Sequence, residues 1–165
     1  MYKYKAVAAV FFVLFLMFLQ IKVFAADFSL PKVTIGPDKY LLFSVERLME
    51  NIVGFTKFTK QSKVDYYKEL TLKRIAELKY VVDNKLLSEV ERSSQRVSFE
   101  VGTLSDYISA NKSELLKQSS EITNFLTGFQ DLFANLRDKY PANSAYWLLI
   151  QHDINSININ LQKLK

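Results

Sequence analysis

The apolar residues of this chain fall into two kinds of pattern, one continuous and one periodic. Residues 6–19 form an unbroken apolar run that follows a short cationic start at residues 1–5. From about residue 38 onward, apolar residues instead recur every three or four positions, which places them on one face of an α-helix. The sequence therefore predicts an N-terminal targeting segment followed by a domain made of helices.

The N-terminal segment has the three parts of a secretory signal: a charged start, an apolar core and small residues before a cleavage position. Cleavage after Ala25 places Val23 and Ala25 at the positions that favour small side chains, so Ala26 is the expected mature N-terminus. Retention as a membrane anchor stays open, because residues 6–26 are long enough to span a bilayer if Lys22 snorkels to its surface. Both outcomes predict an extracytoplasmic protein (periplasmic, cell-surface or secreted), bound to the membrane at its N-terminus if the segment is retained.

A linker and five helices are predicted after this segment. Residues 26–37 contain two prolines and a glycine and show no helical period, so we expect a linker there. Five segments with helical spacing follow, at about residues 38–53, 63–83, 87–108, 115–140 and 145–164. The last contains the alternating stretch INSININL, which is also typical of a strand, but its sustained three- and four-residue spacing favours a helix. The first has an apolar stripe of the kind that a helix buries, made of Tyr40, Leu41, Val45, Leu48, Met49 and Ile52.

The third and fourth predicted helices carry heptad seams. The seam of the third is Leu87, Val90, Ser94, Val97, Val101, Leu104 and Ile108, and that of the fourth is Leu115, Ser119, Ile122, Leu126, Phe129, Phe133, Leu136 and Tyr140. Folding the two helices about residues 111–113, with Ser113 as an N-cap, pairs Ile108 with Leu115 and Leu87 with Leu136 in one register. We therefore predict an all-α fold, a five-helix bundle over residues 38–165 built around a long antiparallel helical hairpin. Asn143 or Ser144 is expected to cap the last helix.

The amino-acid composition supports long helices and reduces the number of reactions and metal sites that the protein could have. Only three prolines and four glycines occur in 165 residues, and there is no cysteine. An exported domain without disulfides has to be held by its apolar core, and cysteine-based catalysis or metal binding is excluded. The net charge is +5, but Lys3, Lys5 and Lys22 lie in the targeting segment, which leaves 19 basic and 17 acidic residues. Nucleic acid is therefore not an expected partner.

No arrangement of residues typical of an enzyme stands out. His152 is the only histidine and neighbours Asp153, but adjacent residues of a helix point about 100° apart, so we expect an exposed histidine and no preformed dyad. No nucleophile elbow, phosphate-binding loop, zinc-protease motif or dinucleotide fingerprint is present. We therefore predict that the protein is not an enzyme and uses no cofactor or metal. The alternative, an unrecognised hydrolase, predicts clustered carboxylates of raised pKa in a pocket.

The connection between the first two helices interleaves aromatic and basic residues, namely Phe55, Lys57, Phe58, Lys60 and Lys63. This pattern suits contact with anionic lipid headgroups or single-stranded nucleic acid. The simpler expectation, which we favour, is that Phe55 and Phe58 plug the end of the bundle while the lysines are solvated. Four tyrosines outside the predicted stripes either mark a partner surface or are buried by a second neighbouring helix: Tyr66, Tyr80, Tyr107 and Tyr146.

Several short motifs resemble an uncharacterised bacterial family of exported or membrane-anchored helical domains, known as a domain of unknown function. They are the proline-containing entry at residues 36–41, the Glu-Arg-Leu-Met-Glu stretch at residues 46–50, Phe55-Thr56, and the Arg-Ile-Ala-Glu-Leu stretch at residues 74–78. The similarity covers about residues 30–110. The resemblance implies a helical domain outside the cytoplasm, and it implies no reaction, cofactor or catalytic residue.

The sequence thus predicts residues 1–25 as signal peptide or membrane anchor, 26–37 as linker and 38–165 as one helical domain. We expect a non-enzymatic extracytoplasmic domain that binds a protein, a peptide or a component of the cell envelope through its helix faces. The alternative is a periplasmic chaperone or an envelope-stress sensing protein. That alternative predicts a concave apolar surface.

Overall fold

The computed structural model describes residues 29–165, and every regular element in that range is an α-helix. The predicted targeting segment and its cleavage position between Ala25 and Ala26 lie outside the described residues. The helices of the described range are α2 (Tyr40–Phe55), α3 (Lys60–Asp83), α4 (Leu87–Ala110), α5 (Leu116–Thr127), α6 (Gln130–Arg137) and α7 (Ala145–Leu164). The all-α prediction is confirmed, and α5 and α6 together occupy the place of the fourth predicted helix. None of the helices in residues 29–165 is long and apolar enough to cross a bilayer.

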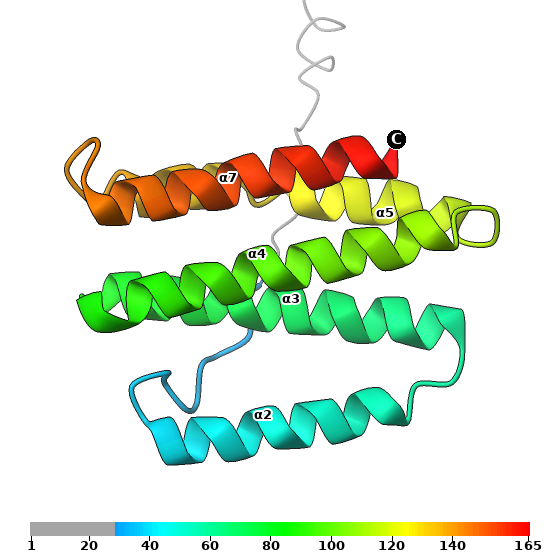
Figure 1. Ribbon diagram of the computed structural model, residues 1–165, viewed down its shortest axis with the longest axis horizontal. Helices are drawn as coiled ribbons and strands as arrows, with labels where there is room; N and C mark the ends of the chain where they lie inside the picture. Colours follow the sequence, from blue (N-terminus) through cyan, green and yellow to red (C-terminus); the bar gives the residue numbers. More distant parts are fainter. Residues whose placement is uncertain (1–28) are drawn as a thin grey trace, which may run out of the picture.

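Two antiparallel hairpins make up the body of the bundle (Figure 1). One consists of α3 and α4, and the other of α5 and α6 with α7. The hairpins stack so that α4 lies beside α7 and runs in the same direction. Helix α2 lies outside this body, at the lower edge of the view, beyond α3 and α4.

Most positions of the predicted heptad seams are buried, but the seams pair the wrong helices. Ser94 of α4 donates a hydrogen bond to the Leu149 carbonyl of α7 at 3.4 Å, and Ser119 of α5 donates to the Leu164 carbonyl at 2.7 Å. Both serines therefore contact α7 rather than large side chains across an α4–α5 seam. The long antiparallel partner of α4 is α3. Leu87, expected in the seam, is 46% exposed because it starts α4 at the end of the bundle.

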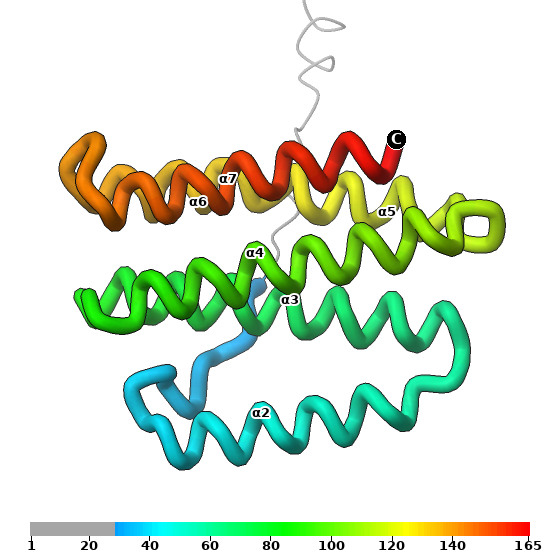
Figure 2. Tube along the Cα trace, viewed as in Figure 1, coloured from blue at the N-terminus to red at the C-terminus, as the bar shows by residue number. Residues whose placement is uncertain are grey.

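The fourth predicted helix is divided at Gly128 and Phe129. Figure 2 shows α5 and α6 lying end to end behind α7. At the junction the Phe129 amide bonds to the Leu126 carbonyl at 3.2 Å, so the backbone tightens to three-residue bonding for one step. Phe129 itself stays in the core, which explains why the apolar spacing passes through the break undisturbed.

Caps explain where two of the helices begin. Thr59 and Ser62 form a reciprocal capping box, so α3 starts at Lys60, three residues before the predicted boundary. Ser144 accepts a hydrogen bond from the Trp147 amide at 3.3 Å, as one of the two predicted caps of the last helix. Ser113 does not cap the next helix, because α5 begins after Leu115 and has no side-chain cap.

The hydrophobic core lies between the two hairpins. Its largest fully buried apolar side chains come from α3 to α7, including Ile75, Leu104, Phe125, Phe133 and Ile150. Residues of α2 are absent from this cluster in the described part of the chain, and the one buried side chain of α2, Phe43, lies outside it. Helix α2 is therefore attached to the bundle by other means.

Candidate functional site: the outward-facing apolar helix α2

Helix α2 turns its apolar side toward solvent. The residues of this side are between 45% and 85% exposed, and we call them the outer face: Leu41, Leu42, Val45, Leu48, Met49, Ile52, Val53 and Phe55. The prediction that this stripe is buried is wrong. The three charged residues of α2, namely Glu46, Arg47 and Glu50, are half-buried instead, so the exposed positions of α2 carry no charge at all.

The inward side of α2 is held by ion pairs to α3. Lys73 donates to Glu46 at 2.6 Å and also pairs with Glu50. Arg74 donates to the other oxygen of Glu50. Because the two glutamates are four residues apart, they lie on one side of α2 and reach adjacent positions of α3. The apolar stripe occupies the opposite side and is therefore directed outward.

Beneath these pairs lies a buried group of charges that we call the charge layer. Arg74 is 2% exposed and donates to Glu77 at 2.6 Å, while its Nε lies 3.9 Å from Glu100. Arg96 of α4 approaches Glu77 at 3.6 Å. The layer contains four glutamates and four basic residues, all buried or half-buried: Glu46, Arg47, Glu50, Lys73, Arg74, Glu77, Arg96 and Glu100. Equal numbers of opposite charges leave the layer with no net charge, and the ion pairs of Arg74 with Glu50 and Glu77 make the burial of these groups tolerable.

Proton affinities within the layer follow from burial and pairing. Burial disfavours the charged form of Glu50, but the hydrogen bonds from Arg74 and Lys73 outweigh it and lower the pKa of that carboxyl. Burial dominates at Glu77 and Glu100 and raises the pKa of both, although Arg74 opposes the effect. Burial also acts against the charge of Arg74, yet Glu77 and Glu50 raise its pKa overall. Of these three carboxyls, Glu50 is the one whose contacts with α3 favour the charged form.

Aromatic side chains complete the attachment of α2. The Tyr66 hydroxyl donates to the Glu50 carbonyl at 3.0 Å and lies against Gly54, where a Cβ atom would come within 2.7 Å of that hydroxyl. Gly54 therefore permits this close approach of α3 to α2. At the other end, the Tyr40 hydroxyl donates to Glu89 of α4 at 2.7 Å. Phe43 lies between, with the Arg96 guanidinium 5.0 Å from its ring centre.

The connection from α2 to α3 extends the outer face. Phe55 and Phe58 are 83% and 89% exposed, so the expectation that they plug the end of the bundle is wrong. Phe55 is the last residue of α2, Phe58 follows in the connection, and neither belongs to the core cluster of the described residues. Lys57 and Lys63 are half-buried, and Lys60 forms an ion pair with Glu114. The structure therefore brings the two aromatics, but not all three lysines, to a freely accessible surface.

The four tyrosines outside the predicted stripes are all half-buried. Tyr66 packs its ring 5.4 Å from Tyr67, which in turn lies 5.4 Å from Tyr107. Tyr140 and Tyr146 are 5.3 Å apart near the turn before α7. These side chains are largely engaged in contacts between helices, so they do not form a second exposed aromatic surface.

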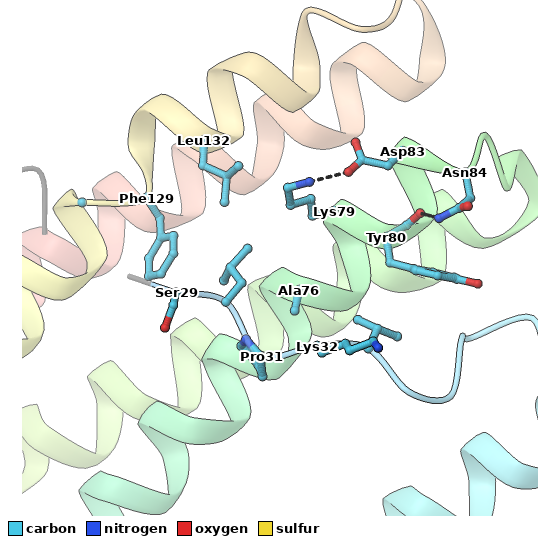
Figure 3. A pocket seen from close by; sticks show the side chains of 13 residues that line it. Ser29, Pro31, Lys32, Ala76, Lys79, Tyr80, Asp83, Asn84, Phe129 and Leu132 are labelled. Carbon is cyan, nitrogen blue, oxygen red and sulfur yellow. Dashed lines mark hydrogen bonds and ion pairs between the residues drawn. The ribbon is translucent and has the colours of Figure 1, made fainter. Parts of the chain in front are cut away.

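A groove lies on another side, between α3 and the junction of α5 and α6 (Figure 3). The linker lines one side of it: Ser29 lies toward Phe129, Pro31 and Lys32 lie beside Ala76 of α3, and Leu30 packs against the core. The groove encloses about 760 Å³, and Lys79 and Asp83 form an ion pair at its rim. The start of the described chain forms part of the wall of this groove, which is a structural role for the predicted linker.

The residues considered for catalysis are not brought together. His152 is exposed, whereas Asp153 is fully buried and accepts a hydrogen bond from Ser98 of α4 at 2.7 Å. Residues 29–165 contain no cluster of three or more histidine or acidic side chains suited to a metal ion. The clustered carboxylates that a hydrolase would need do occur, at Glu50, Glu77 and Glu100. They are paired with Arg74 underneath α2, however, and that geometry supports attachment of the helix.

Sequence reasoning missed the charge layer. The sequence itself gives little signal for it, because Arg74 and Glu77 are each directly adjacent to a core residue of α3, Ile75 or Leu78, and only the structure shows that they are buried. The neighbour of a core position is not usually buried on a helix with one apolar face, so its burial implies a helix covered on two sides. The second covering helix is α2, through its polar side.

Comparisons of this chain with protein-family models, curated proteins and solved structures find no match. The resemblance to a family of exported or membrane-anchored helical domains therefore stays a prediction.

Proposed function

We propose that this protein is a non-enzymatic extracytoplasmic binding domain whose contact surface is the outer face of α2. The observation that carries the proposal is the orientation of this helix, with eight apolar side chains exposed and its charged residues turned inward. Scattered exposed apolar residues are normal on protein surfaces, whereas a contiguous apolar patch is typical of an interaction site. An extracytoplasmic location is supported by the three-part pattern of the N-terminal segment.

The energetics support a role for the outer face. Full burial of one leucine or isoleucine side chain stabilises a protein by about 1.5–3 kcal/mol, so leaving several exposed forgoes a large stabilisation. The inverse orientation of α2 would bury this face but would break the ion pairs of Glu46 and Glu50 with Lys73 and Arg74. The charge layer therefore holds the apolar face in a position where a partner can cover it.

A chaperone or envelope-stress sensor stays the alternative, because an exposed apolar helix also suits transient contact with unfolded chains. The outer face lies on the outside of a single helix rather than within a concave surface. For that reason a defined partner is the better-supported form of the proposal. Suppression of aggregation of unrelated unfolded proteins at equimolar concentration, lost on Leu48→Glu substitution, would favour the chaperone instead.

Site-specific photo-cross-linking in the producing cells tests the proposal. A photoreactive residue is placed at Leu48 of α2 or, as a control, at Leu116 of α5, because the two side chains are 60% and 61% exposed. We expect a discrete adduct, to protein or to lipid, from position 48 and none from position 116. Equal yields from both positions, or none from either, would contradict a binding role for α2.

A further inference from the structure

We infer that the partner of the outer face is the surface of an anionic lipid bilayer, on which α2 lies parallel to the membrane plane. This inference rests on the proposed function and names its partner. An in-plane helix buries an apolar side among the acyl chains and keeps its polar side away from them. Helix α2 has this division, and its polar side is occupied by the charge layer of the same chain.

The width of the outer face favours a bilayer over a single partner helix. At about 100° per residue, the apolar side chains from Leu41 to Phe55 cover an arc of about 160° around α2. A two-helix coiled coil buries a narrower seam, with two positions in every seven. A continuous apolar medium covers a broad arc completely. No exposed residue of α2 carries a charge that insertion would have to desolvate.

Residues at the two ends of α2 suit the headgroup region. Phe55 and Phe58 at the end of the helix are 83% and 89% exposed. Phenylalanine is among the residues that in-plane helices bury at the boundary between the acyl chains and the headgroups. The exposed Lys39 precedes the helix and the half-buried Lys57 follows it, so a basic residue lies at each end of an uncharged face. This arrangement is complementary to anionic lipid, which attracts lysines near its surface.

The chain sequence independently connects the domain with a membrane. Nine residues separate the apolar run of residues 6–19 from Ser29, where the described structure begins. Such a segment is delivered to the membrane during export and, if retained, keeps the domain there. A domain held near a bilayer in this way meets the lipid surface at a high effective concentration, which strengthens a weak second contact.

The test uses single-cysteine variants of the full chain, which has no cysteine of its own. Leu48→Cys and the matched control Leu116→Cys are labelled with an environment-sensitive fluorophore and mixed with vesicles of phosphatidylglycerol and phosphatidylcholine, or of phosphatidylcholine alone. On anionic vesicles, we expect the emission of the label at position 48 to shift to shorter wavelength. Its quenching by aqueous iodide should fall at least about threefold. The label at position 116 should stay accessible, and substitution of the exposed Lys39, as Lys39→Gln, should weaken the effect at position 48 severalfold.

Because the readout is local, binding of the N-terminal segment alone cannot reproduce it. Equal shielding of both labels, or a label at position 48 that stays accessible on anionic vesicles, would overturn the lipid contact. Shielding of position 48 that grows with protein concentration and needs no vesicles would overturn it in favour of a second copy of the chain. A cross-link from position 48 to a protein, together with a label that stays accessible on vesicles, would overturn lipid as the partner of the outer face. The proposed function, a binding role for α2, would still be supported.

Discussion

Arg74 connects three glutamates from three different helices. It pairs with Glu50 of α2, with Glu77 of its own helix and, at longer distance, with Glu100 of α4. An arginine suits this position because its planar guanidinium offers five donors in a fixed geometry. The pairing of Arg74 is therefore the part of the charge layer on which both the attachment of α2 and the burial of Glu77 depend.

Replacing Arg74 with methionine should be among the most destabilising single changes in the chain. The substitution leaves Glu50, Glu77 and Glu100 without their shared partner, and breaking a buried pair of this kind costs about 3–5 kcal/mol. Urea denaturation measures the loss. Lys139→Met is the control, because Lys139 is 48% exposed in its pair with Asp83 and should matter by at most about 1 kcal/mol. Similar effects of the two substitutions would contradict the role of Arg74.

The burial of Asp153 leads to a separate prediction, about how the free energy of unfolding depends on pH. It is buried between α4 and α7 with Ser98 as hydrogen-bond donor, and burial raises its pKa from 3.8 to about 7. The folded state thus holds a proton that the unfolded state releases, so the stabilisation is complete below pH 3.8 and is lost as the pH rises toward 7. This group alone should lower the free energy of unfolding by about 1.4 kcal/mol per pH unit between those values.

Asp153→Asn removes that titration and keeps an oxygen that can accept from Ser98. Denaturation curves of the two proteins between pH 4 and 8 should therefore diverge, with the variant gaining relative stability as the pH rises. Parallel dependence of both proteins on pH would show that Asp153 is already charged in the folded state at acidic pH.

At the level of elements, α2 is the helix whose orientation the sequence predicts least well. Its apolar spacing correctly identifies a helix, because Leu41, Leu48 and Ile52 fall on one side whatever that side contacts. Spacing alone does not tell whether the apolar or the polar side faces the rest of the chain. That choice depends on Lys73 and Arg74, which become neighbours of α2 only once the chain is folded.

For the other helices too, the sequence predicts which positions are buried but not which helices pack together. The core positions of α4 and α5, such as Val101 and Ile122, are predictable because burial is encoded in local spacing. Their pairing is not, because α3 and α7 offer equally suitable apolar faces and the choice is made by the whole bundle. The candidate site was predictable only in part: Phe55 and Phe58 were identified, but their exposure depends on the orientation of α2.

Helix α2 should detach more readily than the other helices when its main ion pair is weakened. In Glu50→Gln, the charge-assisted contacts with Lys73 and Arg74 are lost, which removes about 1.5–3 kcal/mol of local stability. Hydrogen exchange at neutral pH should show protection factors at least about tenfold lower in α2 and unchanged in α4. Glu91→Gln, at an exposed position of α4, is the control. Uniform loss of protection throughout the chain would contradict a locally attached helix.

The pKa of Glu50 predicts the same detachment in acid. Its folded value lies below the usual 4.5, so the stabilisation from its pairing is present at neutral pH and is lost as the pH falls through that lowered value. Protection factors corrected for intrinsic exchange should fall in α2 before they fall in α4 as a sample is acidified below pH 4. Simultaneous loss in both helices would indicate that Glu50 is not specifically responsible.

At the scale of the whole molecule, the protein consists of a self-contained core and an attached helix. The core cluster draws on α3 to α7, whereas α2 adds one buried phenylalanine outside it. The surface beneath α2 is charged, so water can solvate it if the helix is removed. A chain beginning at Phe58 should therefore remain helical and unfold cooperatively, with reduced stability, as measured by circular dichroism during heating.

The matched comparison is a chain that ends at Tyr140 and so lacks α7. That helix supplies Ile150 and Ile157 to the centre of the core, and its removal should abolish cooperative unfolding. If removal of α2 is as damaging as removal of α7, the two-part description of the molecule is wrong.

The orientation of α2 is most directly measured by thiol reactivity in dilute, vesicle-free solution. Single cysteines are introduced at Leu41, Leu48, Ile52 and Phe43, and the rate of labelling of each folded protein is compared with its rate in urea. Cysteines at the first three positions should react at nearly the unfolded rate, and a cysteine at position 43, where the phenylalanine is 6% exposed, at least about tenfold more slowly. Protection at positions 41, 48 and 52, with rapid labelling at 43, would show that α2 buries its apolar side and would contradict the binding surface proposed for it.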